Sequence, residues 1–208
     1  MGTMGSGKTT AARLIAKELG FHLLEENFSD NIFLSRFYND MKRWAFHSQT
    51  FFLTEKLRQI MSIPKIISRR PIVQDTPIQQ DVYSYAQAQL TLGNMTDDEW
   101  KLYLQTYTLF EPYLPVPDLI IYLEAALPVL KNRIAKRSRS YERMIPEEYL
   151  RLLDKLNRVW MTKNKNIPIQ KVNTDGFDFN NDKSAKKSFL KIIRKNIYNL
   201  NVRLSAIR

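Results

Sequence analysis

The first ten residues, MGTMGSGKTT, have the types and spacing of a phosphate-binding loop. Gly2 and the triplet Gly7-Lys8-Thr9 form the pattern G-x-x-x-x-G-K-T, in which backbone N–H groups surround phosphate oxygens. The helix that follows adds the partial positive charge of its N-terminal end. Lys8 is placed to reach the β and γ phosphates of a nucleotide, and the Thr9 hydroxyl is placed to bind Mg²⁺. We expect ATP to contact the whole loop, namely Gly2, Thr3, Met4, Gly5, Ser6, Gly7, Lys8, Thr9 and Thr10.

Acidic residues follow two short apolar segments that have the pattern of strands. The pair Glu25-Glu26 follows Phe21–Leu24, and Asp75 follows the segment PIVQ. Ligands of open α/β sheets bind at the carboxyl ends of the strands. A carboxylate of the pair can accept a proton from an attacking hydroxyl, and Asp75 can help to hold Mg²⁺ beside Thr9. A solvated loop and a helix-capping aspartate are the simpler alternatives.

A cluster of basic side chains ends the helix predicted over residues 129–137. Its members are Lys131, Arg133, Lys136, Arg137 and Arg139. Arginines of a mobile lid can close over phosphates and offset the charge that develops in the transition state. We therefore expect a lid at about 136–145, with Arg137 and Arg139 in catalysis and Arg133 and Arg137 on ATP. An ordinary solvated face is the alternative.

Helical and strand patterns alternate along the chain. Helical periodicity predicts helices at 6–19, 33–62 with a break at Asn39-Asp40, 79–92, 96–110, 129–137, 146–164 and 183–199. Strands are predicted at 21–24, 71–73, 118–123 and 169–172. The apolar run DLIIYL at 118–123 is typical of a strand buried on both faces of a parallel sheet. The alternation predicts one doubly wound α/β domain over residues 1–208, with a parallel sheet of about five strands.

A loop of this kind normally follows a central strand, yet a single residue precedes Gly2. An open slot in the sheet would leave buried backbone groups unpaired, at a cost of about 1–3 kcal/mol each. A whole domain is stable by only about 5–15 kcal/mol. We therefore expect a first strand that is missing from this sequence, and loss of function is the alternative.

Composition sets broad limits on function. The chain of 208 residues is 44% hydrophobic and 25% charged, as globular domains are. It has no cysteine and two histidines, which excludes thiolate sites and leaves little for a histidine metal centre. We find neither a secretory signal nor an apolar run near the roughly 20 residues of a membrane span, so we expect a cytoplasmic protein without a membrane partner. The formal charge of +11 permits nucleic-acid binding, but the dispersed basic residues and the phosphate loop favour small polyanions.

These segments together resemble the deoxynucleoside kinase family, which includes the deoxycytidine, deoxyguanosine and deoxyadenosine kinases. The resemblance covers nearly the whole chain through GTMGSGKTT, EENFSDNIFLSRFYNDMKRWAFHSQTFF, DLIIYL and RIAKRSRSYE followed by EEYL. It implies a P-loop kinase fold and transfer of the γ-phosphoryl group of ATP, with Mg²⁺, to the 5′-hydroxyl of a deoxynucleoside in nucleotide salvage. It also implies a homodimer built on helices that flank the sheet.

The resemblance implies roles for single residues as well. Glu26 would be the base that faces the 5′-hydroxyl, with Glu25 as its neighbour and not the catalyst. Tyr38 and Glu142 would bind the sugar 3′-hydroxyl. Gln49 would bind the nucleobase through its amide, which both donates and accepts hydrogen bonds.

Two further matches concern the nucleobase, and one segment departs from the family. Lys56 and Asp81 fall where relatives that accept purines or cytosine have an arginine and an aspartate, so we expect a purine deoxynucleoside or deoxycytidine as substrate. At Asp75-Thr76-Pro77 the family has an acidic residue, an arginine and Ser or Thr. That arginine helps to hold the 5′-hydroxyl and the catalytic carboxylate, so its loss removes a charge-assisted hydrogen bond of about 1.5–3 kcal/mol. We expect Asp75 to face the substrate, and Arg69 or Arg70 are candidates to replace the arginine.

Two other functions remain open on the sequence. A nucleoside monophosphate kinase, such as a thymidylate kinase, shares the loop and the arginine lid, but it needs a basic site near Glu26, where this sequence is acidic. A nucleotide-binding protein without catalytic activity would explain Thr76-Pro77 and the absent first strand. The joint presence of Glu26, Tyr38, Gln49, Glu142 and the lid arginines argues against that alternative.

Overall fold

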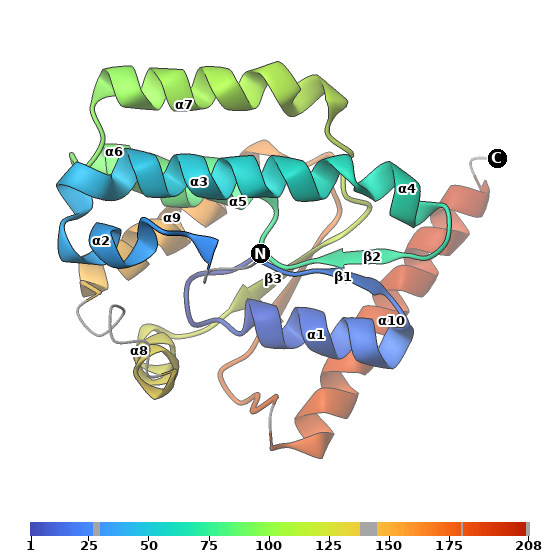
Figure 1. Cartoon of the computed structure of the whole chain (residues 1–208). Coiled ribbons are helices and arrows are strands. Elements are labelled where there is room, and N and C mark those ends of the chain that lie inside the picture. The colour runs from blue at the N-terminus through green and yellow to red at the C-terminus, as the bar shows by residue number, and fades with distance from the viewer. Residues whose placement is uncertain (27–29, 138–144, 180, 207–208) are drawn as a thin grey trace.

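The computed structural model describes residues 1–26, 30–137, 145–179 and 181–206, with side chains through residue 200 (Figure 1). Four short strands form two parallel pairs in this part of the chain. β1 (His22–Leu24) pairs with β2 (Ile72–Gln74), and His22 lies opposite Ile72. β3 (Ile120–Glu124) pairs with β4 (Ile169–Asn173), and Ile120 lies opposite Ile169. All four strands lie within about two residues of their predicted bounds.

The two pairs differ from the single sheet of about five strands that the sequence predicts. Figure 1 places the N-terminus between β2 and β3, where Met1 N donates to Ile121 O at 2.8 Å and Gly2 bridges to Leu123 in parallel. On the other side of Gly2, the side-chain amide of Gln80 accepts from Gly2 N at 3.1 Å and donates to Gly2 O at 2.6 Å. Gly2 thus has partners on both sides, although no described strand pairs with it on the β2 side.

Helices cover both faces of the strands, as the prediction of a doubly wound arrangement requires. On one face, α1 (Lys8–Leu19) and α10 (Lys183–Ala206) pack over β3 and β4. Their buried contacts come from Ala11, Ile15, Leu123, Val172, Phe189 and Ile193. On the other face, α9 (Glu147–Lys163) brings Trp160 against the strand residue Tyr122. The apolar run in β3 is buried because it contacts both layers.

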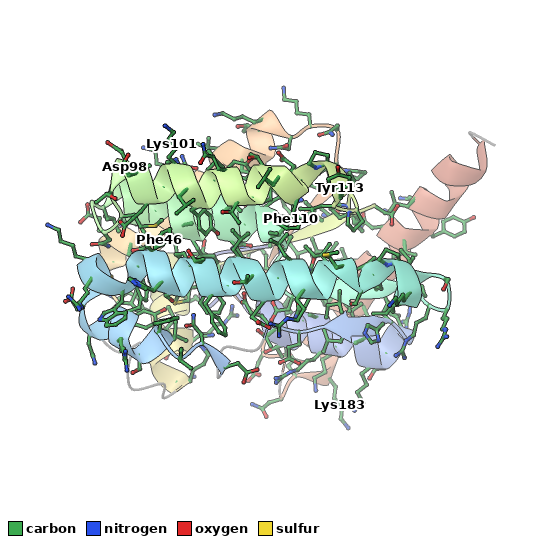
Figure 2. All side chains as sticks on the ribbon, turned by 45° about the horizontal axis from the view of Figure 1, so that its top comes forward. Phe46, Asp98, Lys101, Phe110, Tyr113 and Lys183 are labelled. Atoms are coloured by element: carbon green, nitrogen blue, oxygen red, sulfur yellow. The ribbon has the colours of Figure 1, made fainter. Side chains whose placement is uncertain are left out.

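A second helical layer stands above α9 in Figure 1. The predicted break at Asn39-Asp40 separates α2 (Leu34–Asn39) from α3 (Met41–Met61), because the Asp40 carboxylate caps α3 by accepting from Arg43 N at 3.1 Å. α7 (Asp97–Phe110) begins with the predicted capping box. Figure 2 shows α7 beside α3 at the front, with Asp98 toward one end and Tyr113 toward the other.

The helix predicted over 79–92 is interrupted by a π-helix. α5 (Ile78–Gln80) leads into the π-helix η2 (Asp81–Ala86), and α6 (Gln87–Thr91) follows. Segments of π-helix are rare and frequently occur at functional sites. Asp81 and Tyr85, four residues apart in this segment, both line the cleft described below. The sequence pattern did not reveal this interruption.

Three further elements complete the described structure. α4 (Ile63–Ile67) extends α3 and was not predicted. The 3₁₀-helix η3 (Glu111–Tyr113) follows α7, and α8 (Leu127–Lys136) follows β3 near its predicted position. Among the described residues, no helix combines the length and the apolar character that crossing a membrane demands.

Candidate active site

A cleft of about 970 Å³ lies between the phosphate-binding loop, the helical layer and α8. It is lined by segments from distant parts of the sequence: the loop before α1, the residues after β1 and β4, and side chains of α2, α3, η2 and α8. The predicted site residues on its wall are Met4, Gly5, Gly7, Lys8, Thr9, Thr10, Glu26, Tyr38, Gln49, Asp81, Arg133 and Arg137. The fold therefore collects most of the predicted site around one space.

The phosphate-binding loop has the backbone that its glycines permit. Gly5 and Gly7 have φ angles of +83° and +95°, in the left-handed region, and a Cβ at Gly5 would lie 2.9 Å from Leu130 O. Lys8 Nζ donates to Gly2 O at 2.9 Å and to Thr3 O at 3.3 Å, so the lysine lies across its own loop. Burial lowers the pKa of Lys8 to about 8. An incoming phosphate would favour the charged form again.

Thr9 and Asp75 meet as the sequence predicts. Thr9 Oγ1 donates to Asp75 Oδ2 at 2.6 Å, and Asp75 N donates to Leu24 O at 2.9 Å. The loop helix and the ends of β1 and β2 are thereby tied together at one point. Two oxygen atoms suited to a hard cation lie side by side at this point.

Glu26 and Glu25 point to different surroundings. The Glu26 side chain is 9% exposed, and its Oε1 lies 3.5 Å from Lys56 Nζ. Burial raises the pKa of Glu26, and the nearby Lys56 charge opposes this effect. Glu25 forms an ion pair with the exposed Arg13 at the mouth of the cleft. The geometry agrees with Glu26, and not Glu25, as the proton acceptor.

Tyr38 on α2 and Gln49 on α3 face the same cleft as Glu26. The Tyr38 ring packs edge-to-face on Phe37, with 5.0 Å between ring centroids. Gln49 is 5% exposed, and its amide has no hydrogen-bond partner among the described residues. A buried amide that faces a cavity can bind the polar edge of a ligand without displacing another contact.

Comparison with known proteins identifies the family of this chain. Residues 1–198 match the family model described as deoxynucleoside kinase. The chain belongs to the deoxynucleoside kinase family. It is an enzyme, a phosphotransferase that uses ATP to phosphorylate the 5′-hydroxyl of a deoxynucleoside. The resemblance inferred from the motifs is thus confirmed.

Several deoxynucleoside kinases are similar to the chain over most of its length. A deoxyadenosine/deoxycytidine kinase of Bacillus subtilis (strain 168) is 32% identical over 186 residues, which cover 88% of this chain and 85% of the relative. A deoxyadenosine kinase of Lactobacillus acidophilus is 31% identical over 203 residues, or 92% of each protein. The solved structure of deoxyadenosine kinase from M. mycoides with bound dATP gives a TM-score of 0.80 at 25% identity, covering 95% of this chain and 97% of that chain.

The basic cluster on α8 divides into two parts in this deoxynucleoside kinase. Arg133 donates to Thr174 Oγ1 at 3.1 Å, to Phe177 O at 3.0 Å and also to Thr174 O, so its guanidinium ties α8 to the segment after β4. Arg137 lines the cleft at the end of α8, and its charge helps to lower the pKa of Lys8. Arg139 and Glu142 lie outside the described residues, as do residues 138–144 of the predicted lid.

The structure also places residues in the site that the sequence analysis missed. Tyr85 lines the cleft with its hydroxyl 3.3 Å from Lys8 Nζ. The segment 175–179 forms another part of the wall, where Phe179 lies beside Gly7. Asp75 and Asp175 both follow a predicted strand, so the strand-end rule that found the first would have found the second. Nothing in the sequence singles out Tyr85, because its place in the site depends on a contact with Lys8, which is 77 positions away.

Arg69 and Arg70 do not replace the missing arginine at position 76. Both precede β2, whereas Asp75 follows it, and a strand advances about 3.3 Å per residue. Both side chains are exposed, and Arg70 Nη2 lies 2.7 Å from His22 Nδ1 at the surface. The expectation that Arg69 or Arg70 replaces this arginine is therefore wrong, because they lie at the opposite end of β2 from residue 76.

Proposed function

We propose that this deoxynucleoside kinase acts on a purine deoxynucleoside or deoxycytidine, with Glu26 as the base. The observation that carries the proposal is the largely buried Glu26 carboxylate, which lines the same cleft as the phosphate loop, Tyr38 and Gln49. The relatives named above phosphorylate deoxyadenosine or deoxycytidine according to their names. The polar Gln49 and Asp81 support the same preference.

The two ends of the cleft would hold the two substrates. The loop N–H groups and Lys8 bind the phosphates of ATP, and Arg133 and Arg137 lie on the same side of the cleft. Tyr38 and Gln49 orient the sugar and the base of the acceptor. Glu26 accepts the proton of the 5′-hydroxyl as its oxygen attacks the γ phosphorus. Positioning and charge stabilisation supply most of the acceleration in such transfers.

Thr9 and Asp75 would hold Mg²⁺. Mg²⁺ is usually bound by one or two carboxylates together with substrate phosphates and waters, so this pair of oxygens fits it. The bound ion would neutralise charge on the β and γ phosphates. A lid around Arg137 and Arg139, with Glu142 on the sugar, belongs to the same proposal.

The assembly is proposed to be a homodimer through α7. Exposed apolar side chains gather on and just after this helix: Leu102, Leu109, Phe110, Tyr113 and Val116. Figure 2 shows Phe110 and Tyr113 at one end of it. Light scattering should give two chains per particle, and L109D should give one, whereas V159D on α9 should leave the dimer intact. A dimeric L109D would contradict this interface.

One catalytic domain over residues 1–208, a cytoplasmic location and the absence of nucleic-acid and membrane partners remain predictions. A first strand ahead of Gly2 also remains one.

The test of the proposed function is phosphorylation of each of the four deoxynucleosides with Mg-ATP, beside the variant E26Q. We expect turnover with deoxyadenosine, deoxyguanosine or deoxycytidine, and a loss of at least about 100-fold in E26Q with ATP binding retained. Preference for thymidine would overturn the substrate assignment, and full activity of E26Q would overturn the role of Glu26. Phosphorylation of a nucleoside monophosphate in place of all four would favour the monophosphate kinase alternative.

A further inference from the structure

The Lys56 side chain is enclosed by the protein and makes no part of the cleft wall. It is 2% exposed, and its Nζ donates to Thr76 O at 2.8 Å and to Asp75 O at 3.2 Å. The same atom lies 3.5 Å from Glu26 Oε1 and 3.8 Å from Asp81 Oδ2. An ammonium has three N–H donors; two of them bind backbone carbonyls here, and the third faces the two carboxylates. A nucleobase would find no donor left on Lys56.

The turn at Thr76 has a conformation that presents its carbonyl to Lys56. Thr76 has a φ of +58°, in the left-handed region that β-branched residues rarely adopt, and it is buried. Strained backbone of this kind persists when surrounding contacts hold it. The charge-assisted bond from Lys56 to Thr76 O is such a contact.

Lys56 also separates acidic groups that would otherwise repel each other. Glu26, Asp75 and Asp81 converge on this point; Asp75 and Asp81 are buried, and the Glu26 side chain is 9% exposed. Removal of the only ammonium that touches both Glu26 and Asp81 among the described residues would leave like charges facing each other in a region of low dielectric constant. Glu26 would then shift away from the position from which it faces the acceptor.

We propose that Lys56 is a positioning residue that holds the Glu26 carboxylate and the turn at 75–76 in one arrangement, and so replaces the arginine that the family resemblance implies at position 76. This inference rests on the proposed function, since it assumes that Glu26 is the base. It assigns Lys56 to the position of the proton acceptor Glu26. Recognition of the nucleobase is left to Gln49 and other residues of the cleft wall.

The test compares K56M and K56R with the wild-type enzyme on deoxyadenosine, deoxyguanosine and deoxycytidine. We expect K56M to lower kcat about 10- to 100-fold on every accepted substrate, the range for a lost charge-assisted hydrogen bond. KM values and the ratios between substrates should change less than about threefold, because the cleft wall is intact. K56R should recover most of kcat. The matched control is K42M, an exposed lysine on the same helix, which should behave as wild type.

A double variant separates positioning from general damage. Because Lys56 acts in large part through Glu26, the loss in E26Q/K56M should be smaller than the product of the two single losses, whereas independent effects would multiply. If K56M does not fold, K56Q replaces it, since its amide can still donate to Thr76 O. Circular dichroism and ATP binding verify that each variant is folded.

The outcomes distinguish this inference from the proposed function. A wild-type enzyme that phosphorylates no deoxynucleoside would defeat the proposed function itself. An active wild type in which the Lys56 variants alter the preference among bases, with kcat unchanged on the best substrate, would overturn the positioning role and restore base recognition. Multiplicative losses in the double variant would overturn it as well.

Discussion

The hydroxyl of Thr9 donates a 2.6 Å hydrogen bond to the carboxylate of Asp75, which joins the first turn of α1 to the end of β2. The two residues are 66 positions apart in the sequence. Their contact places the proposed Mg²⁺ ligands beside the phosphate loop, and the bond from Asp75 N to Leu24 O adds the end of β1. The ends of β1 and β2 therefore support both the phosphate loop and the nearby Glu26.

The variant D75N tests the metal site. It keeps the shape of the side chain and removes the negative charge, so we expect at least a tenfold increase in the Mg²⁺ concentration that gives half the maximal rate. ATP binding without Mg²⁺ should change little. The exposed Asp118 supplies a control, and D118N should leave the Mg²⁺ dependence as it is. An unchanged dependence in D75N would remove Asp75 from the metal site.

The pH dependence of kcat tests the state of Glu26. A general base acts only when it is ionised, and burial raises the pKa of Glu26 above its ordinary value of 4.5. The rate should therefore fall as the pH decreases, with a midpoint above 4.5. Rates measured from about pH 8 down to about pH 5, with circular dichroism at each pH, give the midpoint of the folded enzyme. A constant rate down to the pH of unfolding would exclude titration of the base.

The close approach at Gly5 is tested by G5A against G93A. Both glycines have positive φ angles, +83° and +69°, which cost an alanine about 1–2 kcal/mol. A Cβ at Gly5 would also lie 2.9 Å from Leu130 O, whereas nothing lies within 4 Å at Gly93. Thermal unfolding should therefore show a larger fall in Tm for G5A, and ATP should protect G5A poorly. Equal Tm values and equal protection by ATP in the two variants would mean that the phosphate loop moves easily to accommodate the added Cβ.

The bonds from Arg133 to Thr174 and Phe177 are tested by R133M. R133M removes three charge-assisted hydrogen bonds to partly buried acceptors, so we expect a destabilisation of about 1–3 kcal/mol and a raised KM for ATP. K131M on the same helix removes an exposed ion pair with Glu147 and should change the stability little. Urea unfolding measures the stability of each variant, and ATP titrations of the rate measure its KM. A normal KM with lowered stability would confine Arg133 to a structural role.

Local features of the sequence predicted much of the fold. Gly20 ends α1 in the left-handed conformation, Asp40 caps α3, and Thr96 starts α7 with its capping box. Each depends on residues a few positions apart, so the pattern alone identifies it. The phosphate loop and the strand-end carboxylates were found in the same way.

Contacts between distant segments were beyond the reach of such patterns. The sequence shows that position 56 carries a positive charge. It does not show where the ammonium points, because that depends on how α3 packs against the end of β2. Arg133 likewise belongs to a predicted basic cluster, yet its partners follow β4, about 40 residues later. The sequence pattern also did not show that the strands form two pairs in place of one sheet, because this depends on which segment lies beside Gly2.

The π-helix lets its segment take in more residues per turn than the roughly 3.6 of an α-helix. Deletion of one residue from 81–86 that restored α-helical winding should therefore leave α5 and α6 on the same faces. Gln89 on α6 would keep its 3.0 Å bond to Tyr149, whereas the contact of Tyr85 with Lys8 would depend on which residue was removed. The segment is thus a place where the chain length can change by one residue without turning the helix that follows it.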